Sequence, residues 1–125
     1  MTTVRGATTV RGAYDDGPAF NIDNYKETPV LSLQWIGGNV LVQARLLVVN
    51  YDKDYQSFKI WLSHGSARHT LDYIDWYMQD GYKGMVFLSG WTFNLHPNEI
   101  IEIRCATYKG LASHPRMTAT LIDPV

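Results

Sequence analysis

The stretch VLVQARLLVVNY, residues Val40–Tyr51, carries the pattern from which the fold class follows. Successive side chains of a β-strand point to opposite faces, so an apolar residue at every second position predicts a half-buried strand. From Leu46 to Val49 the stretch is apolar at every position, so we expect a central strand with one end covered on both faces. The alternating apolar residues are Val40, Val42, Ala44, Leu46 and Val48.

The same alternation continues on both sides of this segment and predicts about seven to eight strands. Turn formers such as Gly37-Gly38, Gly65-Ser66 and Asp80-Gly81 separate the alternating runs, and no segment shows a helical period. Many short strands separated by turns are typical of an antiparallel β-sandwich or a jelly roll. The sequence does not distinguish a jelly roll from an immunoglobulin-like connection. The further predicted strands are 29–36, 57–63, 72–78, 83–93, 99–108 and 116–122.

The first 28 residues lie outside this rhythm. The hexapeptide TTVRGA occurs twice, at Thr2–Ala7 and Thr8–Ala13. Because six is even, an extended arm would place Val4 and Val10 on one side and Arg5 and Arg11 on the other. We therefore expect an extended arm and tether at 1–28, which binds a neighbouring subunit, and a β-sandwich domain at 29–125. A mobile tail or a cloning remnant is the alternative.

Composition excludes several classes of function. With 125 residues and 46% hydrophobic residues, the chain fits one folded domain. A formal net charge of −1 argues against phosphate-driven binding of nucleic acid. The sequence shows neither an ordinary secretory signal nor an apolar run long enough for a membrane span. The single cysteine, Cys105, has no partner for an internal disulfide.

No motif predicts catalysis, a metal or a cofactor. The segment LSHGSAR, Leu62–Arg68, lacks the glycine-flanked serine of a nucleophile elbow, and we interpret it as a polar hairpin loop. The segment YDKDY, Tyr51–Tyr55, lacks the glycine and the last glutamate of a calcium loop. Cys105 lies among isoleucines and is expected to be a buried structural thiol. The four histidines are scattered, at positions 64, 69, 96 and 114.

Aromatic residues provide the strongest hint of a binding surface. The chain has four Trp and eight Tyr, and exposed Trp and Tyr mark protein interfaces or sugar platforms. Burial of these rings by the second sheet or by the arm is the alternative. The densest patch is Asp72–Gly84. Partner-binding residues predicted from the aromatic surface are Trp61, Tyr73, Trp76, Tyr77 and Tyr82, which join Val4, Arg5, Val10 and Arg11 of the arm.

The chain from Leu47 to Asp123 resembles short all-β proteins of bacteriophage particles. The resemblance lies in the order and hydrophobic pattern of the strands: LVVN (Leu47–Asn50), FKIWLS (Phe58–Ser63), DYI (Asp72–Ile74), VFLSGWTF (Val86–Phe93), EIIEIR (Glu99–Arg104) and MTATLI (Met117–Ile122). It implies a non-enzymatic virion structural protein: a capsid cement or decoration protein, or a tail-associated adaptor. It implies localisation in the virion after synthesis in the host cytoplasm.

The partners that this resemblance implies are protein subunits, such as a major capsid or tail protein, together with further copies of the chain itself. An extended arm can add a strand to a neighbour's sheet edge through main-chain hydrogen bonds. A carbohydrate-binding, lectin-like module is the alternative function. In that reading, Asp72, Asp75 and Trp76 supply part of a sugar site.

Overall fold

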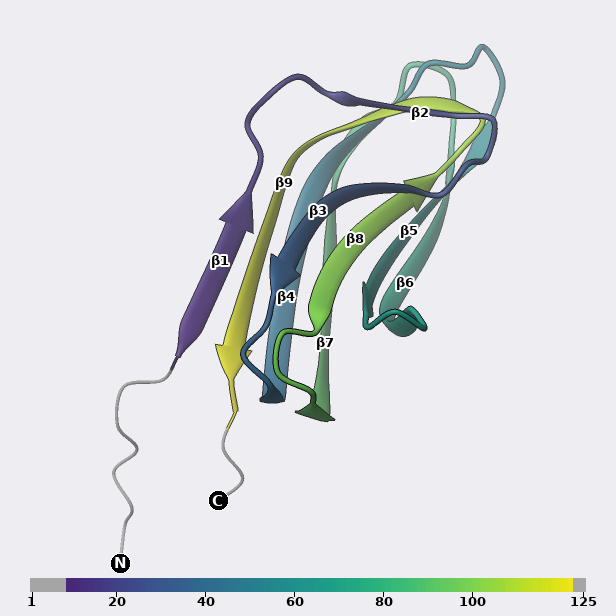
Figure 1. Cartoon of the computed structure of the whole chain (residues 1–125). Coiled ribbons are helices and arrows are strands. Elements are labelled where there is room, and N and C mark those ends of the chain that lie inside the picture. The colour runs from purple at the N-terminus through teal and green to yellow at the C-terminus, as the bar shows by residue number, and fades with distance from the viewer. Residues whose placement is uncertain (1–8, 123–125) are drawn as a thin grey trace, which may run out of the picture.

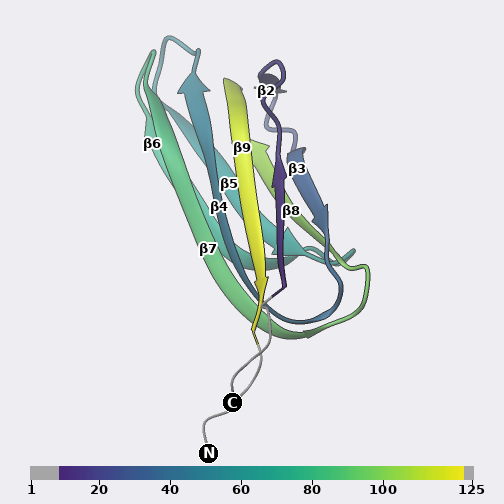
Figure 2. The same cartoon turned by 90° about the vertical axis from the view of Figure 1, so that its left-hand side faces the viewer.

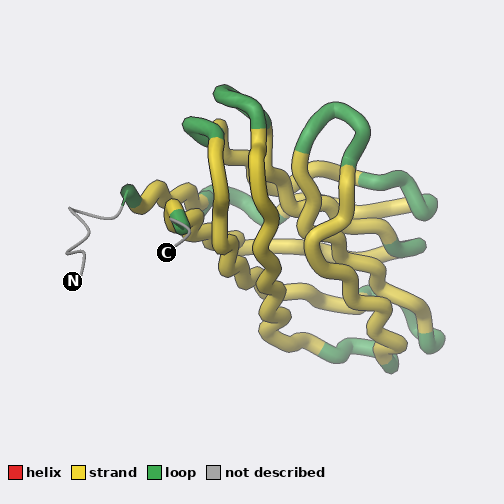
Figure 3. The backbone as a smooth tube through the Cα atoms, turned by 90° about the horizontal axis from the view of Figure 1, so that it is seen from below, coloured by secondary structure: helices red, strands yellow, loops and turns green. Residues whose placement is uncertain are grey.

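The structure is a computed structural model that describes residues 9–122, and every regular element in this range is a β-strand. Figure 3 shows strands joined by loops, and no helix of the described residues is long and apolar enough to cross a membrane. The all-β prediction is therefore confirmed. The strands are β1 (Val10–Tyr14), β2 (Phe20–Asp23), β3 (Thr28–Gln34), β4 (Gly38–Asn50), β5 (Gln56–His64), β6 (His69–Met78), β7 (Lys83–Leu95), β8 (Ile100–Ala106) and β9 (Lys109–Leu121).

These strands form two antiparallel sheets that face each other (Figure 1, Figure 2). Sheet A has the order β1-β9-β4-β7, with β2 also paired to β9, and sheet B has the order β3-β8-β5-β6. The pairings are nested along the chain: β5 with β6, β4 with β7, β3 with β8, and β1 and β2 with β9. A long antiparallel hairpin wrapped in this way is a jelly roll.

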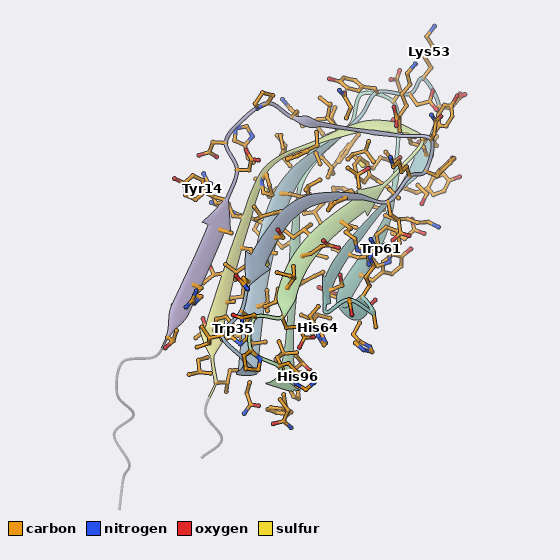
Figure 4. All side chains as sticks on the ribbon, viewed as in Figure 1. Tyr14, Trp35, Lys53, Trp61, His64 and His96 are labelled. Atoms are coloured by element: carbon orange, nitrogen blue, oxygen red, sulfur yellow. The ribbon has the colours of Figure 1, made fainter. Side chains whose placement is uncertain are left out.

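The core lies between the sheets and consists of the side chains that alternation places inward. On β4, every second residue from Val40 to Val48 is buried, as the sequence predicts. Sheet B contributes Phe58 and Ile60, among others, and Trp35 closes one end of the sandwich (Figure 4). β-Branched and aromatic residues favour strands because they pack well on a pleated, half-buried surface. Burying these side chains supplies most of the free energy that holds the two sheets together.

β9 is longer than its predicted range of 116–122, because a bulge interrupts its alternation. Its pairing with β4 shifts between Arg45 and Leu47, and His114 has a positive φ of 51°. Before the bulge, Gly110 and Ala112 face inward, and after it the inward phase resumes at Pro115. A bulge adds one residue to one strand, so the period of two changes phase there. The sequence pattern alone therefore gives only the second half of the strand.

The expected arm contributes two strands to sheet A of its own chain. β1 pairs with β9 from Val10 opposite Thr120 to Tyr14 opposite Arg116, and β2 pairs with the other half of β9. Val10 and Arg11 take opposite sides of β1, as expected, with Val10 on the outer face. Val4 and Arg5 of the first hexapeptide lie outside the described residues.

Strands β6 and β7 join the two sheets along one side of the sandwich. The Ser89 N–H of β7 donates a hydrogen bond of 2.9 Å to the Asp72 carboxylate of β6. Next to it, Gly90 lies so close to Leu71 that an added Cβ would stand 2.8 Å from the Leu71 carbonyl oxygen. The glycine thus allows the two edge strands to approach each other. The contacts between β6 and β7 therefore connect the edge of sheet A to the edge of sheet B.

Candidate interaction surface

The outer face of sheet A is unusually apolar for a surface without a cover. Strand register places side chains in rows across the sheet, and one row runs Tyr14, Arg116, Arg45, Phe87 over β1, β9, β4 and β7. Another row contains Val10, Leu41 and Trp91. An antiparallel sheet with one solvated face normally carries polar residues there. The large exposed apolar side chains are Tyr14 (69%), Phe87 (66%), Trp91 (61%), Val10 (56%), Phe93 (52%) and Met85 (41%).

Edge strand β7 supplies most of this apolar surface. Its inward residues Val86 and Leu88 are buried, while Met85 and Phe87 alternate with them and face outward. Further along the strand, Trp91 packs edge to face on Phe93, with ring centroids 5.0 Å apart. Sequence reasoning identified the strand but not this outer row. The signal for it is that the segment from Met85 to Phe93 has large apolar residues in both phases of the alternation.

Two arginines lie directly opposite each other in the centre of this face. The Arg116 guanidinium lies 2.9 Å from an Asp16 carboxylate oxygen and 4.9 Å from the centre of the Tyr14 ring. Arg45 is exposed, and no carboxylate of residues 9–122 lies within ion-pair distance of it. Like charges directly opposite each other in a sheet are destabilising. Asp16 already compensates the charge of Arg116, so Arg45 is the cation of this pair that is left to bind a negatively charged group.

The outer face of sheet B carries most of the aromatic residues that the sequence singled out. Trp61 of β5 and Tyr73 of β6 are cross-strand neighbours with ring centroids 5.4 Å apart, and Tyr77 stacks on Tyr55 at 6.3 Å. Trp61 is half-buried, whereas Tyr77 is exposed. Cross-strand aromatic pairs of this kind stabilise a sheet. Part of the aromatic surplus therefore serves the fold, and Tyr73 and Tyr77 remain accessible.

Trp76 and Tyr82 lie elsewhere. Trp76 is on the inward side of β6, half-buried against the core, and meets the edge of the Tyr82 ring at 4.9 Å. An added Cβ at Gly84 would stand 2.7 Å from the Trp76 ring, so this glycine makes room for the indole. The predicted patch Asp72–Gly84 is thus divided between an outward row and an inward corner. Its residues do not form one surface.

Arg104 of β8 is a buried cation under the outer face of sheet B. Its guanidinium forms ion pairs with Glu27 and Glu102, the second at 3.1 Å, and lies 5.3 Å from the Trp61 ring centre. Its side chain is only 4% exposed. A buried charge must be paired to be tolerated, and here the pairing ties β8 to the segment before β3. Trp61 is consequently held between neighbours and is not the open platform that a bound sugar requires.

One end of the sandwich holds an open cleft of about 690 Å³ between the β5–β6 and β7–β8 loops. The Glu99 carboxylate lies 2.7 Å from His64 Nδ1 and accepts a hydrogen bond of 3.0 Å from the His96 backbone N–H. Figure 4 labels His64 and His96 at this end of the sandwich. His69 stacks on His64 with ring centroids 5.3 Å apart. Three of the four scattered histidines thus gather at this end. No group of three or more ligands in the described part of the chain is suited to a metal ion.

Partial burial acts to raise the pKa of Glu99. The hydrogen bonds from His64 and from the His96 backbone, with the nearby histidine charges, outweigh it and lower the pKa below its ordinary value of 4.5. Glu99 also joins the two loops, because His64 ends β5 while Glu99 precedes β8. The ionised Glu99 carboxylate therefore helps to hold the two loops together, and protonation of Glu99 at acidic pH removes this contribution.

The remaining predictions about chemistry concern single residues. Cys105 is fully buried, and burial raises the pKa of its thiol far above the ordinary value. The prediction that this thiol is buried is therefore confirmed. The segment Leu62–Arg68 spans the end of β5 and the turn to β6, as expected for a hairpin loop. Tyr51–Tyr55 lies in the turn between β4 and β5.

No protein-family model and no curated protein sequence matches this chain. Solved structures from infectious bursal disease virus do match its fold. The Gx strain structure aligns with a TM-score of 0.59 and 11% identity, over 93% of this chain and 33% of the matched chain. The VP2 subviral particle gives 0.59 and 13%, over 91% and 32%. The T=1 particles give 0.60 and 13%, over 91% and 31%.

These likenesses establish a shared fold. This chain spans about a third of the length of each matched chain. The fold that it shares with these structures is a two-sheet β-sandwich, which agrees with the architecture expected from the sequence. A fold by itself does not fix a function, so the function must be argued from the surface.

Proposed function

We propose that this chain is a non-enzymatic structural subunit of a virus particle that binds neighbouring subunits through the outer face of sheet A. The observation that carries the proposal is the exposed apolar row on β7, with Phe87 and Trp91 each more than 60% exposed. A large apolar patch on a folded domain marks a protein interface. The fold shared with VP2 of infectious bursal disease virus particles supports the same reading.

A protein partner fits this face better than a nucleic acid. The outward positions of its strands carry four cations, Arg45, Lys83, Lys109 and Arg116, and the whole chain has a net charge of −1. Nucleic-acid binding depends on many phosphate contacts, each of which needs a cation. Aromatic residues combined with arginine, by contrast, are enriched at protein interfaces.

The finer role that we propose is that of a bacteriophage capsid cement or decoration protein, or a tail-associated adaptor. The order and hydrophobic pattern of the strands from Leu47 to Asp123, described above, support it. In this role the chain acts in the virion, after synthesis in the host cytoplasm, as part of a homo-oligomer on a major capsid or tail protein. Its mechanism is binding alone, without a cofactor.

The first hexapeptide, with Val4 and Arg5, is proposed as a second contact. Its six residues are identical to Thr8–Ala13, most of which forms β1 and pairs with β9. A sequence that forms an edge strand once is suited to form one on a neighbour. Deleting residues 2–7 leaves the second copy in place, and we expect weaker assembly with an unchanged fold. Equal assembly with and without residues 2–7 would exclude this contact.

The main test is the mass of the full-length protein in solution across a concentration series, measured by light scattering. We expect a defined assembly well above the 14.2 kDa of one chain, and its loss in the double variant Phe87→Ser/Trp91→Ser. The matched control is Tyr25→Ser/Tyr108→Ser, which removes another exposed aromatic pair, 5.9 Å apart, from loops away from this face. A monomer at every concentration, or equal losses in both variants, contradicts the proposal.

A further inference from the structure

A small hollow lies in the centre of the outer face of sheet A. It has a volume of about 160 Å³, and its lining includes two guanidinium groups, an amide, a hydroxyl and an aromatic ring. The residues are Gln43, Ala44, Arg45, Phe87, Arg116 and Thr118. Guanidinium groups bind carboxylates through paired, charge-assisted hydrogen bonds. The hollow is therefore suited to receive the carboxylate of an acidic side chain.

The partner must present a different surface from this one. A twofold contact between two copies of the same face, centred on the hollow, would place Arg45 close to Arg45 of the other copy. Arg116 is already paired with Asp16, whereas Arg45 has no carboxylate of the described residues within ion-pair distance. Like charges brought together in an interface oppose association. A head-to-tail contact, in which one face binds another, avoids this repulsion.

Sheet B offers such a surface on its edge strand β6. There, Asp75 faces outward between the exposed rings of Tyr73 and Tyr77. Its carboxylate accepts a hydrogen bond from the Ser57 hydroxyl, which orients it. An acid flanked by two rings is the counterpart of the row on sheet A, in which two arginines are flanked by Tyr14 and Phe87.

The dimensions of the two rows also agree. Tyr14 and Phe87 lie three strand spacings apart, which is about 14 Å at roughly 4.8 Å for each spacing. Tyr73 and Tyr77 lie four residues apart on one strand, which is about 13 Å at roughly 3.3 Å for each residue. A strand that crosses the four strands of sheet A at a right angle would therefore place ring near ring and acid near arginine.

On these grounds, and resting on the proposed function, we propose that the neighbour on sheet A is a second copy of this chain. Its β6 crosses sheet A, with Asp75 in the hollow between Arg45 and Arg116. Lys59 of β5 lies directly opposite Asp75 in the strand register, so its charge offsets that of Asp75 on the outer face of sheet B. The contact therefore depends on where the Asp75 carboxylate is placed and not on the net charge of that face. Because the contact is head to tail, repetition produces a ring or a filament of copies.

A charge exchange tests this contact. We expect Arg45→Glu and Asp75→Arg each to weaken self-association of the full chain at least tenfold, as measured by light scattering over a concentration series. The double variant Arg45→Glu/Asp75→Arg restores an opposite-charge pair, and we expect it to recover most of the association. The matched controls are Lys53→Glu and Asp80→Arg, which make the same charge changes in exposed turns. We expect them to associate like the wild type at equal ionic strength.

Each result supports the contact or overturns it. Rescue in the double variant supports it, because a merely structural role of either residue would not be restored by reversing both charges. Assembly that is equal in all variants overturns the contact, while the proposed subunit function stands on another surface. A wild type that is monomeric throughout overturns both.

Discussion

The two outer faces of this jelly roll use the same residue type in opposite ways. Arg104 on sheet B is 4% exposed and is held by Glu27, Glu102 and Trp61. Arg45 on sheet A is exposed and has no carboxylate of the described residues within ion-pair distance. The first arginine is already paired within the fold, whereas the second is left for a group from outside. Pairing within the chain, rather than residue type, therefore distinguishes an arginine that stabilises the fold from one that is available for binding.

The aromatic residues show the same contrast. On sheet B, Trp61 and Tyr73 pack against each other as cross-strand neighbours. On sheet A, Phe87 is 66% exposed, and its cross-strand neighbour is Arg45, which lies opposite Arg116. Sheet B therefore covers much of its aromatic surface by itself. On sheet A, Trp91 packs on Phe93, but both rings are more than half exposed. Phe87 has no partner ring among the described residues, which is why we place the main interface there.

The largest effect is expected at Arg104. Arg104→Ala leaves Glu27 and Glu102 without their cation and uncovers Trp61, and we expect a loss of about 2–3 kcal/mol in the free energy of unfolding. Arg45→Ala should change it by less than about 0.5 kcal/mol, as for other exposed residues. Urea denaturation of both variants measures the difference. Similar losses in the two variants would remove the contrast between the faces.

The join between the sheets gives the next effect. Gly90→Ala puts a methyl group 2.8 Å from the Leu71 carbonyl oxygen, so β6 and β7 must separate. We expect a loss of about 1–3 kcal/mol, typical of overpacking. Gly12→Ala is the control, because its added Cβ meets Met117 at an ordinary 3.7 Å. If denaturation shows the two variants to be equally stable, the close approach of β6 and β7 is wrong.

Acidic pH should act through the loop cluster rather than through either outer face. The pKa of Glu99 is lower in the fold than its ordinary 4.5, so ionised Glu99 stabilises the fold above about pH 4.5. This contribution is lost as the pH falls through the lowered pKa. Glu99→Gln should therefore be less stable than the wild type at pH 7, and the gap should close as the pH falls below 4.5.

Thermal unfolding at a series of pH values measures that gap. Asp80→Asn, in the exposed β6–β7 turn, is the control, and it should leave the profile of the wild type unchanged. A gap between Glu99→Gln and the wild type that is constant with pH would show that the carboxylate charge does not stabilise the loops.

The smallest effect on stability is expected on the exposed row itself. Phe87→Ser removes a side chain that is 66% exposed, so the unfolding free energy of the monomer should change by no more than about 0.5 kcal/mol. The measurement is denaturation at a concentration low enough to keep the protein monomeric. A loss above about 1 kcal/mol would mean that Phe87 serves the fold, and that this face is less open than its exposure indicates.

The sequence predicted the interior well and the surface less well, for physical reasons. The alternation in Val40–Tyr51 follows from burial of one face, and the buried residues of β4 match it. The bulge near His114 hid half of β9 because it reverses the phase of the pattern. The nested strand order depends on contacts between distant segments, which alternation does not encode.

The site shows the same limit. Outward aromatic residues on β6 were found from local alternation, but the pairing of Trp61 with Arg104 depends on which strands are neighbours. The approach of His64 to Glu99 likewise joins two loops that are distant in sequence. The outer row of β7 was detectable, because its apolar residues occur in both phases, and the hollow between Arg45 and Arg116 was not.

The most direct test of the central claim is hydroxyl-radical footprinting of the assembled full-length protein, read by mass spectrometry. We predict that Met85, Phe87 and Trp91 on sheet A become protected on assembly, relative to the diluted monomer. Tyr25 and Tyr108, in loops away from that face, should stay equally reactive in both states. Unchanged reactivity of Phe87 and Trp91 in a protein that has assembled would contradict the claim that the outer face of sheet A is the interface.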